Sequence, residues 1–132
     1  MLYSPIFTAF VAAAVAFVGA NAEIHTVHFQ NKQPLLKANG SCGDNGEGCT
    51  LIETTLKNPT TPGSGSSTDI SLIPPHTFSV TSGFGYFGAG CDKLGADCTS
   101  PSCPTAFHHP NDTHVQVPCQ GDNVNLAITF CD

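Results

Sequence analysis

The stretch Asn123-Val124-Asn125-Leu126-Ala127-Ile128-Thr129-Phe130-Cys131 alternates apolar side chains with polar or small ones. A period of two is typical of a β-strand that buries one face. Residues 23–30 alternate in the same way, and they predict an opening strand with Val27 and Phe29 directed inward. The two ends of the chain after residue 22 are therefore both expected to be strands.

The residues between these two stretches predict further short strands separated by turns. Strand-like composition occurs in four segments, residues 50–56, 69–73, 77–80 and 114–117. Residues 58–68 (NPTTPGSGSST) and the cysteine-bearing residues 91–103 predict loops, the first with no means of burying itself. No stretch after residue 22 keeps a period near 3.6, so the sequence predicts an all-β sandwich or barrel.

Charge and length exclude several classes of protein. The 132 residues carry 10 acidic side chains and 4 basic ones, all four of them lysine, for a net charge of −6. Binding to phosphate backbones or to anionic membranes needs clustered basic residues. The acidic charge therefore predicts no nucleic-acid partner and no membrane partner. The length of the chain predicts a single domain.

Residues 1–22 have the pattern of a signal peptide. An apolar run over residues 6–18 is too short to predict a membrane span, and Ala20 and Ala22 occupy the small-residue positions of a cleavage site. An uncleaved anchor is the alternative. Cleavage after Ala22 predicts a secreted, extracellular or wall-associated protein that starts at Glu23.

Cysteines and sequons agree with export. All seven cysteines lie after residue 22, where an oxidising compartment favours disulfides, and seven is an odd number. Asn39 and Asn111 both begin N-glycosylation sequons. The sequence therefore predicts a disulfide-bonded glycoprotein with at least one cysteine left over.

Four parts of the chain together match a family pattern. They are the opening strand with Asn31-Lys32, the loop 42–49 with Thr50-Leu51-Ile52-Glu53, Asp69-Ile70-Ser71 with Phe78-Ser79-Val80, and the closing run Cys103-Pro104-Thr105-Ala106-Phe107, Val117-Pro118-Cys119 and Asn125 to Cys131. In order and spacing they resemble the thaumatin-like (osmotin) superfamily, and most closely its small secreted fungal (basidiomycete glycopeptide-type) members. The resemblance implies a truncated, disulfide-stapled thaumatin-like β-sandwich over residues 23–132.

The resemblance also implies how the cysteines pair. It gives Cys42–Cys49, Cys91–Cys119 and Cys98–Cys103. In the family the last cysteine bridges to a first cysteine near the opening strand, but Gln33 follows Lys32 here. A family segment is thus expected to be missing between residues 32 and 41, which leaves Cys131 as a free thiol.

Three acidic residues are the candidate site. Glu53 and Asp69 match two acids that line the family's cleft, and Asp112 is a third candidate for binding. The resemblance implies binding to cell-wall β-1,3-glucan without catalysis. The alternative is a weak endo-β-1,3-glucanase in which Glu53 and Asp69 are catalytic, although this chain has no arginine to hold the carboxylates ionised. A third interpretation is that the sequence lacks an exon.

The histidines are not expected to bind a metal. His25 and His28 fall on opposite faces of the opening strand, and a copper site with His25 at the mature N-terminus would need cleavage after Ile24. His108, His109 and His114 match no zinc spacing. We therefore expect no metal, no cofactor and a monomer, with a Cys131-linked dimer as the alternative.

These expectations predict one reactive thiol in the secreted protein. Titration of the denatured, unreduced monomer with a thiol reagent should find one free thiol per chain, because three disulfides consume six of the seven cysteines. A count of zero would contradict the proposed pairing.

Overall fold

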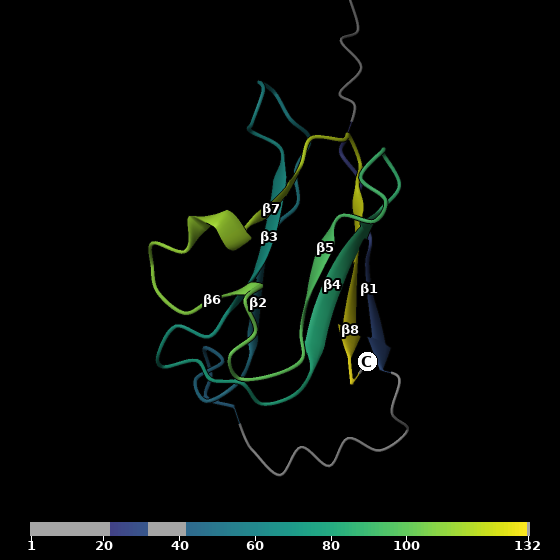
Figure 1. Cartoon of the computed structure of the whole chain (residues 1–132). Coiled ribbons are helices and arrows are strands. Elements are labelled where there is room, and N and C mark those ends of the chain that lie inside the picture. Colours follow the sequence, from purple (N-terminus) through teal and green to yellow (C-terminus); the bar gives the residue numbers. More distant parts are fainter. Residues whose placement is uncertain (1–21, 32–41, 132) are drawn as a thin grey trace, which may run out of the picture.

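In the part of the chain that the structure describes, eight strands form two sheets that lie face to face, as Figure 1 shows. The computed structural model describes residues 22–31 and 42–131. The first sheet has the order β1 (Val27–Asn31), β8 (Asn125–Phe130), β4 (Ser82–Phe87) and β5 (Gly95–Cys98). The second contains β2 (Leu51–Thr55), β3 (Ser66–Ser71) and β6 (Ala106–Phe107), with β7 (Val117–Cys119) also paired to β3 and a 3₁₀ turn, η1 (Thr113–Val115), before β7. The all-β prediction is confirmed, and no helix within the described ranges is long and apolar enough to cross a membrane.

The first sheet is built around β8. This strand runs parallel to β1 on one side and antiparallel to β4 on the other. Leu126 and Ile128 are buried and lie opposite Tyr86 and Phe84 of β4. The apolar residues of the alternating pattern are therefore the ones that point into the core, because every second side chain of a strand enters the space between the sheets.

β4 and β5 are strands that the sequence did not predict. Glycines alternate with the buried Phe84 and Tyr86 along β4, and glycine is ordinarily depleted in strands. A β-carbon at Gly95 of β5 would overlap the carbonyl oxygen of Phe84. Glycine here marks a close approach of two backbones, so the prediction of a loop over residues 91–103 is wrong at residues 95–98.

Polar side chains fill part of the space between the two sheets. Thr68 is fully buried, and its Oγ1 accepts a hydrogen bond of 2.8 Å from the Tyr86 hydroxyl. Thr54 Oγ1 lies 2.7 Å from the same oxygen, and Tyr86 Oη lies 3.0 Å from the Val117 carbonyl oxygen. These contacts satisfy groups that burial would otherwise leave unpaired. The prediction of a loop without burial over residues 58–68 is therefore wrong at its end.

Two predicted strands are absent. Residues 77–80 join no sheet, because Ser79 and Thr50 exchange hydrogen bonds between backbone and side chain instead of forming a ladder. Of residues 114–117, the first two belong to η1, Gln116 follows it, and only Val117 belongs to a strand. Local hydrogen bonds thus override strand composition at both places.

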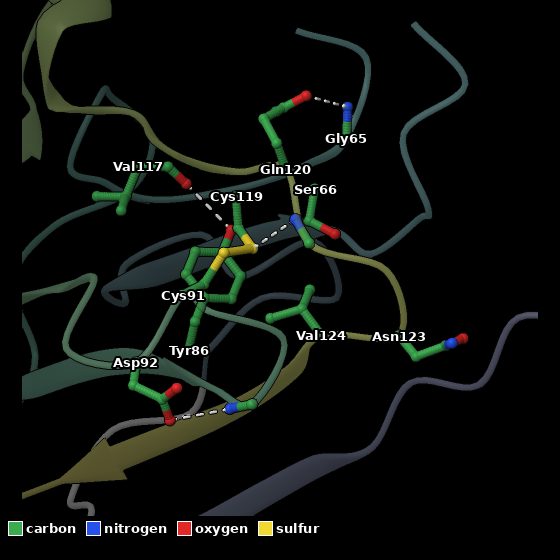
Figure 2. The surroundings of a disulfide bond; sticks show 12 residues. Gly65, Ser66, Tyr86, Cys91, Asp92, Val117, Cys119, Gln120, Asn123 and Val124 are labelled. Atoms are coloured by element: carbon green, nitrogen blue, oxygen red, sulfur yellow. Dashed lines mark hydrogen bonds between the residues drawn. A yellow bond between two sulfur atoms is a disulfide. The ribbon is translucent and has the colours of Figure 1, made fainter. Parts of the chain in front are cut away.

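Three disulfides join the loops, and they are the pairs that the resemblance implies. Cys42 bonds to Cys49, and Cys98 bonds to Cys103. The Cys91–Cys119 bond ties the turn after β4 to β7 in the other sheet, beside Tyr86 and Val117 in Figure 2. Cys131 has no disulfide partner and is partly buried.

The edge strand β1 departs from its prediction in burial. Val27 and Phe29 pair with Leu126 and Ile128, so they lie on the face of the sheet that the core occupies. They are nevertheless 39% and 70% exposed, because no described element covers that end of the sheet. The predicted facing of these side chains is right, and the predicted burial is wrong.

The hydroxyl of Tyr86 should contribute measurably to stability. We expect Tyr86→Phe to lower the free energy of unfolding by about 1–3 kcal/mol, because the buried Thr68 hydroxyl and Val117 carbonyl lose a partner. Urea unfolding measures the change. Thr55→Val removes a hydroxyl from an exposed position of β2 and should change stability by no more than about 0.5 kcal/mol. Equal stability of Tyr86→Phe and wild type would show that the hydroxyl does not join the sheets.

Candidate functional site

Glu53 and Asp69 lie directly opposite each other on neighbouring strands. β2 and β3 are antiparallel, and the register pairs Glu53 with Asp69. Residues opposite each other in such a pair share one face, with β-carbons about 4.5–5.5 Å apart. Two of the three predicted site acids are thus brought together by strand pairing.

This acidic pair faces away from the core. Thr68 points between the sheets toward Tyr86, so the next residue, Asp69, must point to the other side of β3. Phe107 of β6 lies opposite Ser71 and therefore on the same side as Asp69. Figure 1 shows the chain from β6 through η1 on this side of β3, away from β4. This segment shields part of the acidic face.

The two carboxyl groups have different surroundings. Asp69 is 8% exposed, whereas Glu53 is exposed. Burial raises the pKa of Asp69, and the negative charge of Glu53 raises it further. A hydrogen bond from the Gln116 side chain acts in the opposite direction and favours the ionised form. The face therefore presents one buried carboxyl that holds its proton more tightly than usual beside one exposed carboxyl group.

Gln116 is a site residue that the sequence analysis missed. It ends the turn η1, which places its side-chain amide within reach of Asp69. Its neighbours Val115 and Val117 suggested only a strand, and one glutamine in such a pattern carries no signal of its own. Gln116 reaches the site only because residues 107–117 cross the sheet next to Asp69.

Asp112 has a role within its own loop. Its Oδ2 accepts hydrogen bonds from the backbone N–H groups of His109 (2.8 Å) and His108 (3.0 Å). These bonds lower the pKa of Asp112 and hold its carboxylate against the turn that precedes η1. The carboxylate that acts on Asp69 is that of Glu53. The role of Asp112 in binding stays a prediction.

The histidines make separate contacts. His108 Nε2 lies 2.9 Å from the Cys103 carbonyl oxygen, and His28 lies against the ring of Phe87 with 5.6 Å between ring centroids. His25 Nδ1 lies 2.7 Å from the Val124 carbonyl oxygen. Among the residues that the structure describes, no group of three or more His, Cys, Asp or Glu side chains is placed to share a metal ion.

An open hollow lies elsewhere, at the long loop between β2 and β3. It is lined by Pro59, Thr60, Thr61, Pro62, Gly63 and Gln120. Gln120 Oε1 accepts hydrogen bonds from the N–H groups of Gly63 (2.9 Å) and Gly65 (3.2 Å), the second of which Figure 2 shows. No ionisable group lines this hollow, so we assign the site to the carboxyl pair.

Comparison with known proteins adds the family. The chain is 35% identical over 95 residues to two oat (Avena sativa) proteins, thaumatin-like pathogenesis-related proteins 2 and 3. The match covers 69% of this chain and 46% of each relative, so the chain spans about half the length of these curated relatives. No family model matches the sequence.

This chain belongs to the thaumatin-like superfamily. In this thaumatin-like chain the acidic pair lacks a cationic neighbour: within residues 22–31 and 42–131, no lysine lies within 4 Å of Glu53 or Asp69, and the sequence has no arginine. Residues 1–21 of the predicted signal peptide (residues 1–22), the sequon at Asn39 and the expected deletion lie outside the described residues. Asn111 is exposed, beside Asp112.

The charge of Glu53 should have a measurable effect on the pKa of Asp69. We expect Glu53→Gln to lower the pKa of Asp69 toward, but not down to, its ordinary value of 3.8, because burial is the larger cause of the rise. The measurement is a carboxyl-carbon NMR titration.

The raised pKa of Asp69 also makes the stability of the fold depend on pH. The folded state binds this proton more tightly than the unfolded state, so stability falls as pH rises from below 3.8 through the folded pKa. Glu53→Gln should reduce that fall. Glu47→Gln, in the Cys42–Cys49 loop, is the matched control and should leave Asp69 unchanged. An unshifted Asp69 in Glu53→Gln would mean that the two groups do not interact.

Proposed function

We propose that this thaumatin-like chain is an exported wall-associated glycoprotein that binds β-1,3-glucan at the Glu53–Asp69 face without cleaving it. One observation carries the proposal: two opposed carboxyl groups share an outward face, and burial raises the pKa of one of them, Asp69. A protonated carboxyl donates a hydrogen bond and an ionised one accepts hydrogen bonds. Carboxyl groups can therefore complement sugar hydroxyls, which both donate and accept hydrogen bonds.

The surroundings of the acidic pair argue against catalysis. A retaining glycosidase needs carboxyl groups about 5–5.5 Å apart, with the acid able to reach the glycosidic oxygen. The strand pairing brings the β-carbons of Glu53 and Asp69 to about 4.5–5.5 Å of each other. Two neighbouring carboxyl groups keep a weak endo-β-1,3-glucanase as the second candidate. However, Asp69 is only 8% exposed, which hinders it from reaching a glycosidic oxygen as the acid, and the described residues bring no cation to hold the pair preorganised.

Export and glycosylation belong to the same proposal. The apolar leader, three disulfides and the exposed sequon at Asn111 support a secreted glycoprotein. The relatives are named pathogenesis-related proteins, which supports a defence role at the cell wall for this chain too. The expected absence of a segment between residues 32 and 41 would explain both the unpaired Cys131 and the missing arginine.

The binding claim is tested by sedimentation with insoluble β-1,3-glucan. We expect the protein to pellet, and we expect Glu53→Gln and Asp69→Asn each to weaken binding by about 1.5–3 kcal/mol, since each alters a hydrogen bond made by a carboxyl group. Glu47→Gln should bind like wild type. Failure of the wild-type protein to pellet would remove the ligand from the proposal.

Soluble laminarin separates binding from catalysis. The binding proposal predicts no release of reducing sugar over the blank. Release that disappears in Glu53→Gln would instead establish the glucanase.

A further inference from the structure

The chain that precedes β1 is hydrogen-bonded to residues at the start of β8. The N–H groups of Ile24 and Thr26 donate hydrogen bonds to the side-chain oxygens of Asn123 (2.9 Å) and Asn125 (2.8 Å). Glu23 Oε2 accepts a hydrogen bond of 2.7 Å from the N–H of Asn58. Residues 22–26 therefore lie docked, although Ala22, Glu23 and Ile24 remain exposed to solvent.

The His25 side chain packs against residue 124, and this leaves one of its ring nitrogens buried without a hydrogen-bond partner. Its side chain is 10% exposed, and Nδ1 lies 2.7 Å from the Val124 carbonyl oxygen, which requires Nδ1 to be the donor. Nε2 is buried and has no hydrogen-bond partner, and the nearest carboxylate oxygen, Glu23 Oε2, is 3.8 Å away. A buried polar atom without a partner is rare, and here it weakens the docked state.

The order Glu23-Ile24-His25 matters once the chain is cut after Ala22. We propose that the new N-terminus is a Cu(II) site made by these three residues. The four ligands are the α-amine of Glu23, the backbone nitrogens of Ile24 and His25, and His25 Nδ1. Four nitrogens in one plane are the arrangement that Cu(II) prefers, and a histidine in the third position closes the chelate from amine to imidazole. The ammonium and the two amides each release one proton as the ion binds, so three protons leave for each Cu(II) taken up.

Copper binding and docking exclude each other. The Ile24 nitrogen and His25 Nδ1 are used in both states, in one by Asn123 and Val124 and in the other by the ion. Copper would therefore release residues 23–25 from β8 and free the His25 ring from its buried position. Because this site uses an amine and backbone nitrogens, it differs from a cluster of ligating side chains.

Asn123 tunes this competition. Its side chain points away from the disulfide in Figure 2 and holds Ile24 N–H. Its φ of 55° is a conformation that glycine adopts freely, so Asn123→Gly removes the docking group without straining the backbone. The loss of one hydrogen bond should raise the apparent copper affinity about five-fold.

The test uses the full secreted chain. Its N-terminal mass is measured first, because the site rests on the proposed export and on cleavage before Glu23. Cu(II) is then titrated at one equivalent and followed by its visible ligand-field band and by electron paramagnetic resonance. We expect one equivalent bound with the signature of four nitrogens, retained in His28→Ala and lost in His25→Ala. Inserting one serine between Ala22 and Glu23 keeps every side chain but moves His25 to the fourth position, and it should also abolish the signature.

The outcomes separate clearly. An N-terminus other than Glu23 overturns the site without bearing on glucan binding. A chain that starts at Glu23 and lacks the four-nitrogen signature overturns it as well, and so does a signature that survives the serine insertion.

Discussion

The direction in which Thr68 points is the constraint on which the site depends. Its hydroxyl is buried between the sheets, against Tyr86 of one sheet and Thr54 of its own. Side chains alternate along a strand, so fixing Thr68 inward fixes Asp69 outward and opposite Glu53. A slip of one residue would carry a carboxylate into the core and a core residue, Ile70, to the surface. The polar contact inside the molecule thus positions the acidic pair outside it.

The disulfides reinforce this arrangement from the loops. Cys91–Cys119 joins the turn after β4 to β7, and β7 supplies the Val117 carbonyl to Tyr86. The same contact fixes the chain that follows Gln116, whose amide reaches Asp69. The N-terminal strand is held differently, by β8 on one side and by asparagine side chains at its start. This end lacks a disulfide and leaves Phe29 exposed.

Sequence reasoning succeeded where strands alternate regularly and failed where glycine or local hydrogen bonds intervene. β8 and β2 were predicted with nearly the observed bounds. β4 was missed because glycine separates its aromatic residues, and η1 was mistaken for a strand because valines flank it. For the site, the resemblance named Glu53 and Asp69, but no pattern in the chain indicates how far apart they lie or that Gln116 joins them.

The sequence by itself determined the all-β class, the family and the acidic residues, because periodicity, cysteine spacing and motifs are local properties of the chain. Only the tertiary structure decided which side chains are buried and which meet. Asp69 differs from Glu53 because β6 and η1 cross over one end of the sheet, and Phe29 is exposed because nothing described crosses the other. Burial and the shifted pKa depend on what lies across space, and that is set by how distant segments pack.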